Sequence, residues 1–387
     1  MLFNVSGPIV DTDRQTTLRP SLWRYRYVLV LLSLLGILAF YQLAVVVLLR
    51  KSIDLPTSPF QGPTLVNPYQ SWNGDGGEKI SLHAHSNEVW FTPERHTVAE
   101  IQSEYKREGF SNVAITDYGQ ISETEDPNYI RGSEWGQNLK KRHLLAIGIK
   151  KSFYDYFPVY ATRENLNWVI DRMKKLGGYV IVPHPKLFDS FSREEMSSLG
   201  GFQAVEVYSP FGDDPKILDI LLSQGRNVHC MASDDLHYFP ESSIKTFDQP
   251  LWKDLVQTLG NQRGRKGESF LRYIVTAEGV KDQNSVLSSL TSGSFYCVKK
   301  FFSGAEDPKV PLIQITNKGT IQLNSKERYL EIRFIGQTGE VLQVSPDTNH
   351  AEYVFKEKDS YVRLEMIALT GSILSNAIYR QPSKEQF

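Results

Sequence analysis

The longest apolar stretch of the chain lies near its N-terminus. From Tyr27 to Leu49, only Ser33 and Gln42 place polar side chains in a run of apolar residues. A helix needs about 20 such residues to cross about 30 Å of hydrocarbon. The pattern therefore predicts a transmembrane helix at residues 27–49, in contact with the lipid bilayer. A cleaved signal peptide, the alternative, usually has an apolar stretch of only about 7–15 residues.

Basic residues flank this apolar stretch unequally. Four arginines between residues 14 and 26 precede it, whereas Arg50 and Lys51 follow it. Because cytoplasmic flanks carry the excess of basic residues, the asymmetry predicts a cytoplasmic tail at residues 1–26. We expect a single-pass membrane protein whose remaining residues lie outside the cytoplasm, in a periplasmic or extracellular location.

The pattern after the apolar stretch changes twice. Residues 50–77 are rich in proline and glycine and lack helical periodicity, which is typical of an extended linker. From residue 78, short apolar runs alternate with amphipathic stretches, which predicts an α/β domain with a mostly parallel sheet at 78–300. Strands are expected at 79–82, 112–116, 144–149, 179–182, 204–208 and 227–232, and helices at 98–108, 165–176 and 217–223.

After about residue 300, apolar and polar positions alternate between tight turns. Segments 328–336 and 340–344 flank a turn at Thr338 and Gly339, and segments 359–369 and 373–380 continue the alternation. This pattern predicts a small all-β sandwich as an accessory domain at 301–387.

The charge balance and the cysteine count exclude some functions. The 43 basic and 44 acidic residues leave a net charge of -1, so no nucleic acid is expected as a partner. Cys230 and Cys297 lack the short paired spacing of a thiolate zinc site. We expect two buried thiols, although a disulfide between them is possible if their strands lie side by side in an oxidising compartment.

Histidines and carboxylates gather at the ends of the expected strands, where α/β folds build active sites. His83 and His85 are two residues apart on an extended segment, so both rings point to one face and can bind one ion. Further candidates follow or precede the other strands: Asp117, Glu134, His143, His184, Asp235 and His237. Any one of them could be a buried hydrogen-bonded residue or a helix cap. Together, imidazoles and carboxylates without thiolates favour zinc, manganese or iron, and Glu134 could bridge two ions.

The order of these motifs resembles the PHP family, the phosphoesterases named for polymerase and histidinol phosphatase. The resemblance runs from about Ile80 to Lys299. It rests on Leu82-His83-Ala84-His85-Ser86, Ile115-Thr116-Asp117-Tyr118-Gly119, Gly132-Ser133-Glu134-Trp135, His143-Leu144-Leu145-Ala146-Ile147-Gly148, Val182-Pro183-His184-Pro185 and Ala232-Ser233-Asp234-Asp235-Leu236-His237. It implies a distorted seven-stranded (βα) barrel, similar to a TIM barrel.

The resemblance also implies a set of metal ligands. It assigns one divalent ion to His83, His85, Glu134 and Asp235, and a second to Glu134, His143 and His184. Family members often hold a third ion through the histidine of a Thr-Asp-His motif, and this position is Tyr118 here. We therefore expect two ions, with His237 either completing a weak third site or serving as a proton donor or phosphate contact.

Several side chains near the ligands could take part in the reaction. His237 or Asp117 could protonate the leaving group, although we favour Asp117 as the partner that orients a ligand histidine. Tyr118 could donate a hydrogen bond to the substrate or pack at the rim. Arg131 and Lys186 could bind the non-reacting part of an anionic substrate, unless they are ordinary solvated surface residues.

These expectations describe a membrane-anchored, metal-dependent phosphoesterase acting on a phosphorylated small molecule or an envelope-derived substrate. The same ligands could instead activate water for attack on an amide or a cyclic ester. A third hypothesis is a metal-stabilised binding module of the cell envelope without turnover, because the ligands of the third ion are incomplete.

Overall fold

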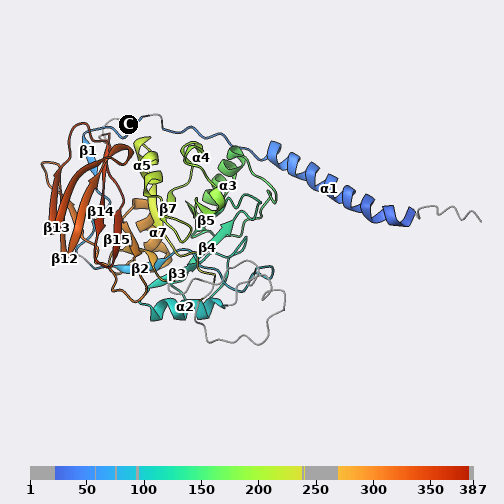
Figure 1. Ribbon diagram of the computed structural model, residues 1–387, viewed down its shortest axis with the longest axis horizontal. Helices are drawn as coiled ribbons and strands as arrows, with labels where there is room; N and C mark the ends of the chain where they lie inside the picture. Colours follow the sequence, from blue (N-terminus) through green and yellow to red (C-terminus); the bar gives the residue numbers. More distant parts are fainter. Residues whose placement is uncertain are drawn as a thin grey trace, which may run out of the picture.

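Helix α1, Leu22–Leu48, projects from the body of the protein (Figure 1). The structure is a computed structural model that describes residues 22–56, 58–74, 76–92, 96–237, 239 and 269–382. Within these ranges, the segment Tyr25–Leu48 of α1 is the one helical stretch long and apolar enough to cross a membrane. The predicted tail at 1–26 lies mostly outside the described residues.

The strands form one mixed sheet. In one part of this sheet, the neighbouring strands follow chain order from β2 to β8. The pairs β2–β3, β3–β4, β6–β7 and β7–β8 are parallel. These strands are β2 (Glu78–Ser81), β3 (Asn112–Ile115), β4 (Ile130–Trp135), β5 (Leu144–Ile147), β6 (Tyr179–Val182), β7 (Ala204–Tyr208) and β8 (His229–Ala232). All six strands predicted from the sequence are present, with ends shifted by a few residues.

Strand β5 runs antiparallel to both of its neighbours, β4 and β6. A parallel pair needs a crossover of about a dozen or more residues, and the loop between Trp135 and Leu144 is too short for one. The sheet is therefore mixed rather than mostly parallel. This reversal places His143, at the start of β5, at the same end of the sheet as Glu134 and His184.

Helices cover the sheet where the amphipathic pattern predicts them. Helix α3 (Arg163–Lys175) buries Leu166, Val169, Ile170 and Met173 on one face, and Thr162 begins it with a capping box. The other helices are α2 (Val98–Arg107), α4 (Arg193–Ser198), α5 (Pro215–Ser223) and α7 (Gln283–Ser292). Short 3₁₀ turns lie at η1 (Leu187–Asp189) and η2 (Gln337–Gly339).

The C-terminal strands extend the same sheet. They are β9 (Arg272–Thr276), β10 (Phe295–Lys300), β11 (Leu312–Ile315), β12 (Thr320–Ile335), β13 (Val341–Val354), β14 (Tyr361–Ile367), β15 (Gly371–Ser375) and β16 (Ile378–Gln381). Strand β15 pairs with β10, and β1 (Thr64–Val66), which lies in the predicted linker, pairs with β16. The accessory domain at 301–387 stays a prediction, and continuous pairing crosses its expected boundary.

The hydrogen-bonded order of strands runs from β1 to β8 without closing. An isolated bridge joins Ala84, after β2, to Leu236, after β8, and the backbone N–H of His85 donates to the carbonyl of Leu236 over 2.8 Å. The two ends of the α/β segment therefore approach each other beside His83 and His85.

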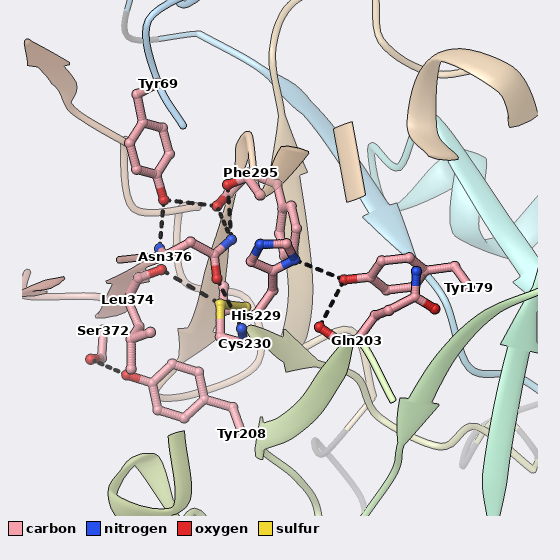
Figure 2. The surroundings of a disulfide bond; sticks show 12 residues. Tyr69, Tyr179, Gln203, Tyr208, His229, Cys230, Phe295, Ser372, Leu374 and Asn376 are labelled. Carbon is pink, nitrogen blue, oxygen red and sulfur yellow. Dashed lines mark hydrogen bonds between the residues drawn. A yellow bond between two sulfur atoms is a disulfide. The ribbon is translucent and has the colours of Figure 1, made fainter. Parts of the chain in front are cut away.

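Cys230 on β8 and Cys297 on β10 form a disulfide, so the prediction of two buried thiols is wrong. The two α-carbons lie 6.3 Å apart, a separation that a disulfide spans. Sequence alone does not show that these strands become neighbours. Figure 2 shows the bond beside Asn376, whose side-chain oxygen accepts the backbone N–H of Cys230 over 2.9 Å.

Candidate metal centre

The predicted metal ligands converge at one end of the sheet. The structure brings together His83 and His85 after β2, Glu134 on β4, His143 before β5, His184 after β6 and Asp235 after β8. All six side chains are buried. Because they come from different strands, the sheet order positions them, and no local motif could do so alone.

Four of these residues form the first ligand group. His83, His85, Glu134 and Asp235 each offer one ligand atom, and these atoms lie within 4.8 Å of one another. The Nε2 atom of His83 is 3.0 Å from Oδ1 of Asp235, and that of His85 is 3.0 Å from Oε2 of Glu134. The group therefore has the size of a shell around one ion.

The second ligand group shares Glu134 with the first. It consists of Glu134, His143 and His184, again with ligand atoms within 4.8 Å. The Oε1 atom of Glu134 is 2.6 Å from Nδ1 of His143 and 3.3 Å from Nε2 of His184. One carboxylate thus faces a different group with each of its oxygens.

Several buried atoms of the cluster have no hydrogen-bond partner among the residues that the structure describes. They include Oε2 of Glu134, Oδ1 of Asp235 and both ring nitrogens of His143. Buried polar atoms are normally hydrogen-bonded, and burying one without a partner destabilises the fold. Nitrogen and carboxylate atoms that face one another fit the ligand preferences of divalent zinc, manganese or iron. Buried groups of this chain could therefore hold metal ions.

Two of the ligands have a strained backbone. His184 has φ of 28° and Asp235 has φ of 47°, in the left-handed region that favours glycine. Such conformations persist only where the surroundings enforce them, and they gather at functional sites. The strain therefore fits the placement of both side chains in the cluster.

The carboxylates of the cluster favour the ionised form. Burial raises the pKa of Glu134, but the neighbouring His143 and His83 outweigh burial and hold this pKa well below its usual range. Burial likewise raises the pKa of Asp235, and His83 and His237 reverse the effect. Burial lowers the pKa of His143, which favours the neutral imidazole that binds metals.

Asp117 lies directly behind the first ligand group. Its Oδ1 atom accepts the backbone N–H of Ser86 over 2.7 Å and lies 3.9 Å from Nδ1 of His85. Its other oxygen accepts hydrogen bonds from the hydroxyls of Ser86 and Ser122. Asp117 therefore fixes the segment that follows His85, and it is 1% exposed.

Tyr118 and His237 enclose His85 from its two faces. The ring of Tyr118 stacks on His85 with centroids 4.7 Å apart, and the ring of His237 stacks at 4.6 Å. His237 also places Nε2 3.3 Å from Oδ1 of Asp235, and 24% of its side chain is exposed. Unlike the six buried ligands, His237 is therefore partly accessible from solvent.

The two predicted substrate-binding residues lie outside the ligand groups. Arg131 is an exposed residue of β4, and its backbone N–H donates to the side chain of Gln283 over 3.0 Å. Lys186, two residues after His184, is exposed, and its amino group donates to the carbonyl of Asp213 over 2.7 Å. Substrate binding by either residue stays a prediction.

Glu206 is a supporting residue whose role the sequence leaves undecided. Its carboxylate, 1% exposed, accepts the backbone N–H of His184 over 2.6 Å and the hydroxyl of Ser233. Burial raises the pKa of Glu206. In the sequence, Glu206 is an acidic residue within an apolar strand. This position predicts a hydrogen-bond partner in the interior but does not identify that partner.

No known protein-family model matches this chain, and no curated protein matches it. Among solved structures, it is similar to an amidohydrolase from Chromobacterium violaceum, whose structure holds sulfate and no metal. The two sequences are 14% identical, the match covers 46% of this chain and 95% of that chain, and the TM-score is 0.31. It is also similar to a provisionally assigned metal-dependent phosphoesterase from Bifidobacterium adolescentis, with 12% identity, 57% and 98% coverage and a TM-score of 0.34. A third is PsfC from Pseudomonas syringae, with 12% identity, 43% and 80% coverage and a TM-score of 0.31. Likeness at this level does not define an activity.

Proposed function

We propose that this protein is a metal-dependent phosphoesterase of the PHP type, with two divalent ions held by the two ligand groups. The observation that carries the proposal is the carboxylate of Glu134, which is shared by two buried groups of histidines and carboxylates. A single structural ion would need only one such group. In this proposal, β2 to β8 belong to a distorted barrel, and the strands after residue 300 form an accessory sandwich.

The proposed chemistry is hydrolysis of a phosphoester. The two ligand groups would hold two divalent ions, which when bound would supply an activated water and neutralise charge on the phosphoryl group. His237 is exposed enough to meet a leaving group and is held against Asp235, so we assign it the role of proton donor. Asp117 is fully engaged with Ser86 and Ser122, so we assign it the orientation of His85.

We further propose that the catalytic residues lie outside the cytoplasm. Helix α1 has the length and composition of a transmembrane segment. The disulfide between Cys230 and Cys297 supports this location, because disulfides persist mainly in oxidising compartments. The substrate would then be a phosphorylated small molecule or an envelope-derived phosphoester.

The test is hydrolysis by the full-length chain in detergent, loaded with Mn²⁺ or Zn²⁺. We expect turnover of p-nitrophenyl phosphate and two bound ions per chain. His184→Ala should remove one ion and nearly all turnover, whereas His350→Ala, at an exposed histidine beside Asn324, should change neither. Retention of both ions by His184→Ala would contradict the ligand assignment. Turnover of amides or cyclic esters, but of no phosphoester, would replace the proposed reaction.

A further inference from the structure

The C-terminal part of α1 packs against the body of the protein instead of standing free (Figure 1). Val45 is buried, and Tyr41, Val46 and Leu49 contact the hydrophobic core. The side-chain amide of Asn165, at the start of α3, donates to the carbonyls of Val46 and Leu49. Helix α1 and the body are therefore joined along the last two turns of the helix.

The part of α1 in which every described side chain is exposed is too short to cross a bilayer. The stretch from Tyr27, after the last arginine, to Phe40 contains about 14 residues, or about 21 Å at about 1.5 Å per residue. The hydrocarbon layer is about 30 Å thick. If α1 spans the membrane, the turns from Tyr41 to Leu48 must also enter it, together with whatever packs on them.

The contacts of the polar side chain of Gln42 identify the segment of the body that lies beside α1 at the membrane. Its amide N–H donates to the carbonyl of Tyr160 over 2.7 Å, and its amide oxygen accepts the N–H of Val159 over 3.2 Å. An amide without hydrogen-bond partners is strongly disfavoured in hydrocarbon. The contact therefore supplies the partners that Gln42 needs there, and it places residues 159 and 160 at the edge of the hydrocarbon, next to the headgroups.

The surface beside this contact has the composition of a membrane interface. Tyr154, Tyr156 and Tyr160 are 68%, 37% and 45% exposed, and Leu139, whose N–H donates to Val159, is 82% exposed. Tyrosine is enriched at the level of lipid headgroups. The exposed lysines 140, 141 and 151 adjoin these residues in sequence, and their long side chains can reach lipid phosphate groups.

We propose that Leu139 and the loop at 153–160, here called the aromatic surface, lie in the headgroup layer of the membrane that α1 spans, with residues 159 and 160 at its border with the hydrocarbon. This inference rests on the transmembrane assignment in the proposed function and adds a second membrane contact to it. Leu139 belongs to the loop between the ligands Glu134 and His143. Two of the ligands therefore flank, in sequence, one part of the proposed membrane contact.

Fluorescence quenching by lipids tests this contact in the full-length chain. The natural cysteines are disulfide-bonded and fully buried, so a thiol-reactive fluorophore labels only an introduced cysteine. Leu139→Cys and Tyr154→Cys are labelled in nanodiscs of phosphatidylcholine and phosphatidylglycerol that contain nitroxide-labelled lipids. Leu369→Cys is the matched control, because Leu369 is 73% exposed in the turn between β14 and β15. We expect quenching several-fold stronger at positions 139 and 154 than at 369.

A label at Leu34, in the middle of α1, separates two kinds of failure. Quenching at 34 without extra quenching at 139 and 154 would overturn the aromatic surface and leave the transmembrane assignment standing. No quenching at 34 would overturn both. Turnover of p-nitrophenyl phosphate by the same samples tests the phosphoesterase independently. Gln42→Leu, which removes both contacts to the loop, should weaken quenching at 154 and leave quenching at 34 unchanged.

Discussion

The backbone N–H of His184 donates to the carboxylate of Glu206 over 2.6 Å. The other oxygen of Glu206 accepts the hydroxyl of Ser233, in the loop that carries Asp235. One buried carboxylate on β7 thus fixes the loops of two ligands from the neighbouring strands β6 and β8. The strained φ of His184 is maintained at this contact.

Glu206→Gln should weaken metal binding without removing a ligand. The amide presents an NH2 donor in place of one acceptor oxygen, so it cannot accept from both donors through separate oxygens, and His184 or Ser233 must shift or reorient. Loss of such supporting partners typically costs about 10–100-fold in metal affinity. Metal titration measures the effect. Asp359→Asn, at a buried carboxylate beside Tyr353, is the control, and equal losses in both variants would indicate general damage.

Asp117→Asn should distinguish the two roles that the sequence leaves open. If Asp117 orients His85, metal affinity falls by about 10–100-fold, and excess metal restores part of the activity. If Asp117 is instead the proton donor, kcat falls by a factor of about 10² to 10⁴ while metal affinity is unchanged. The contacts of Asp117 with Ser86 and Ser122 lead us to expect the first result.

Much of the centre is predictable from the sequence because its ligands sit at strand ends. The spacing of His83 and His85 and the apolar run before His184 already indicate where these side chains point. Three features depend on which strands become neighbours, and no local pattern encodes that. The pairing of Cys230 with Cys297, the contact of Glu206 with His184 and the reversal of β5 are of this kind.

The disulfide should stabilise the fold substantially. Cys230 and Cys297 are 67 residues apart in sequence, and a cross-link over a loop of that length restricts the unfolded chain. The chain-entropy model gives about 4 kcal/mol for such a loop. Replacing both cysteines by alanine should therefore lower the free energy of unfolding by about 2–4 kcal/mol in chemical denaturation. An unchanged denaturation midpoint, or free thiols in the native protein, would contradict this.

The buried His229 should make stability depend on pH. Burial lowers the pKa of His229 to about 4, and its Nδ1 lies 3.0 Å from the hydroxyl of Tyr179 (Figure 2). The unfolded chain, with a histidine pKa of about 6.5, binds a proton that the folded chain rejects. Stability from this group is present above about pH 6.5 and is lost as the pH falls toward about 4, by about 3 kcal/mol in total.

His229→Gln, which cannot titrate there, isolates this effect. Urea denaturation of the metal-free protein at several pH values measures it, because bound metal would add its own pH dependence. The difference in stability between wild type and variant should shrink as the pH falls from neutral toward about 4. A constant difference would show that His229 does not titrate in this way.

The ion pair between Asp219 on α5 and Arg363 on β14 should hold the helix against the C-terminal strands. Two nitrogens of Arg363 each lie 2.7 Å from an oxygen of Asp219, and both side chains are 2% exposed. Arg363→Met leaves the buried aspartate without its charged partner, which typically costs about 3–5 kcal/mol. Chemical denaturation measures the loss. Arg328→Met, which breaks an exposed pair with Asp347, should change stability little.

Glu134 makes the two ligand groups interdependent. Its Oε1 atom faces His143 and His184, while Oε2 faces His83 and His85. A turn of this carboxylate toward one group withdraws it from the other, and protonation would disable both together. Two ions at this centre would therefore fill cooperatively or antagonistically, and a binding isotherm for two independent, equal sites would not describe them.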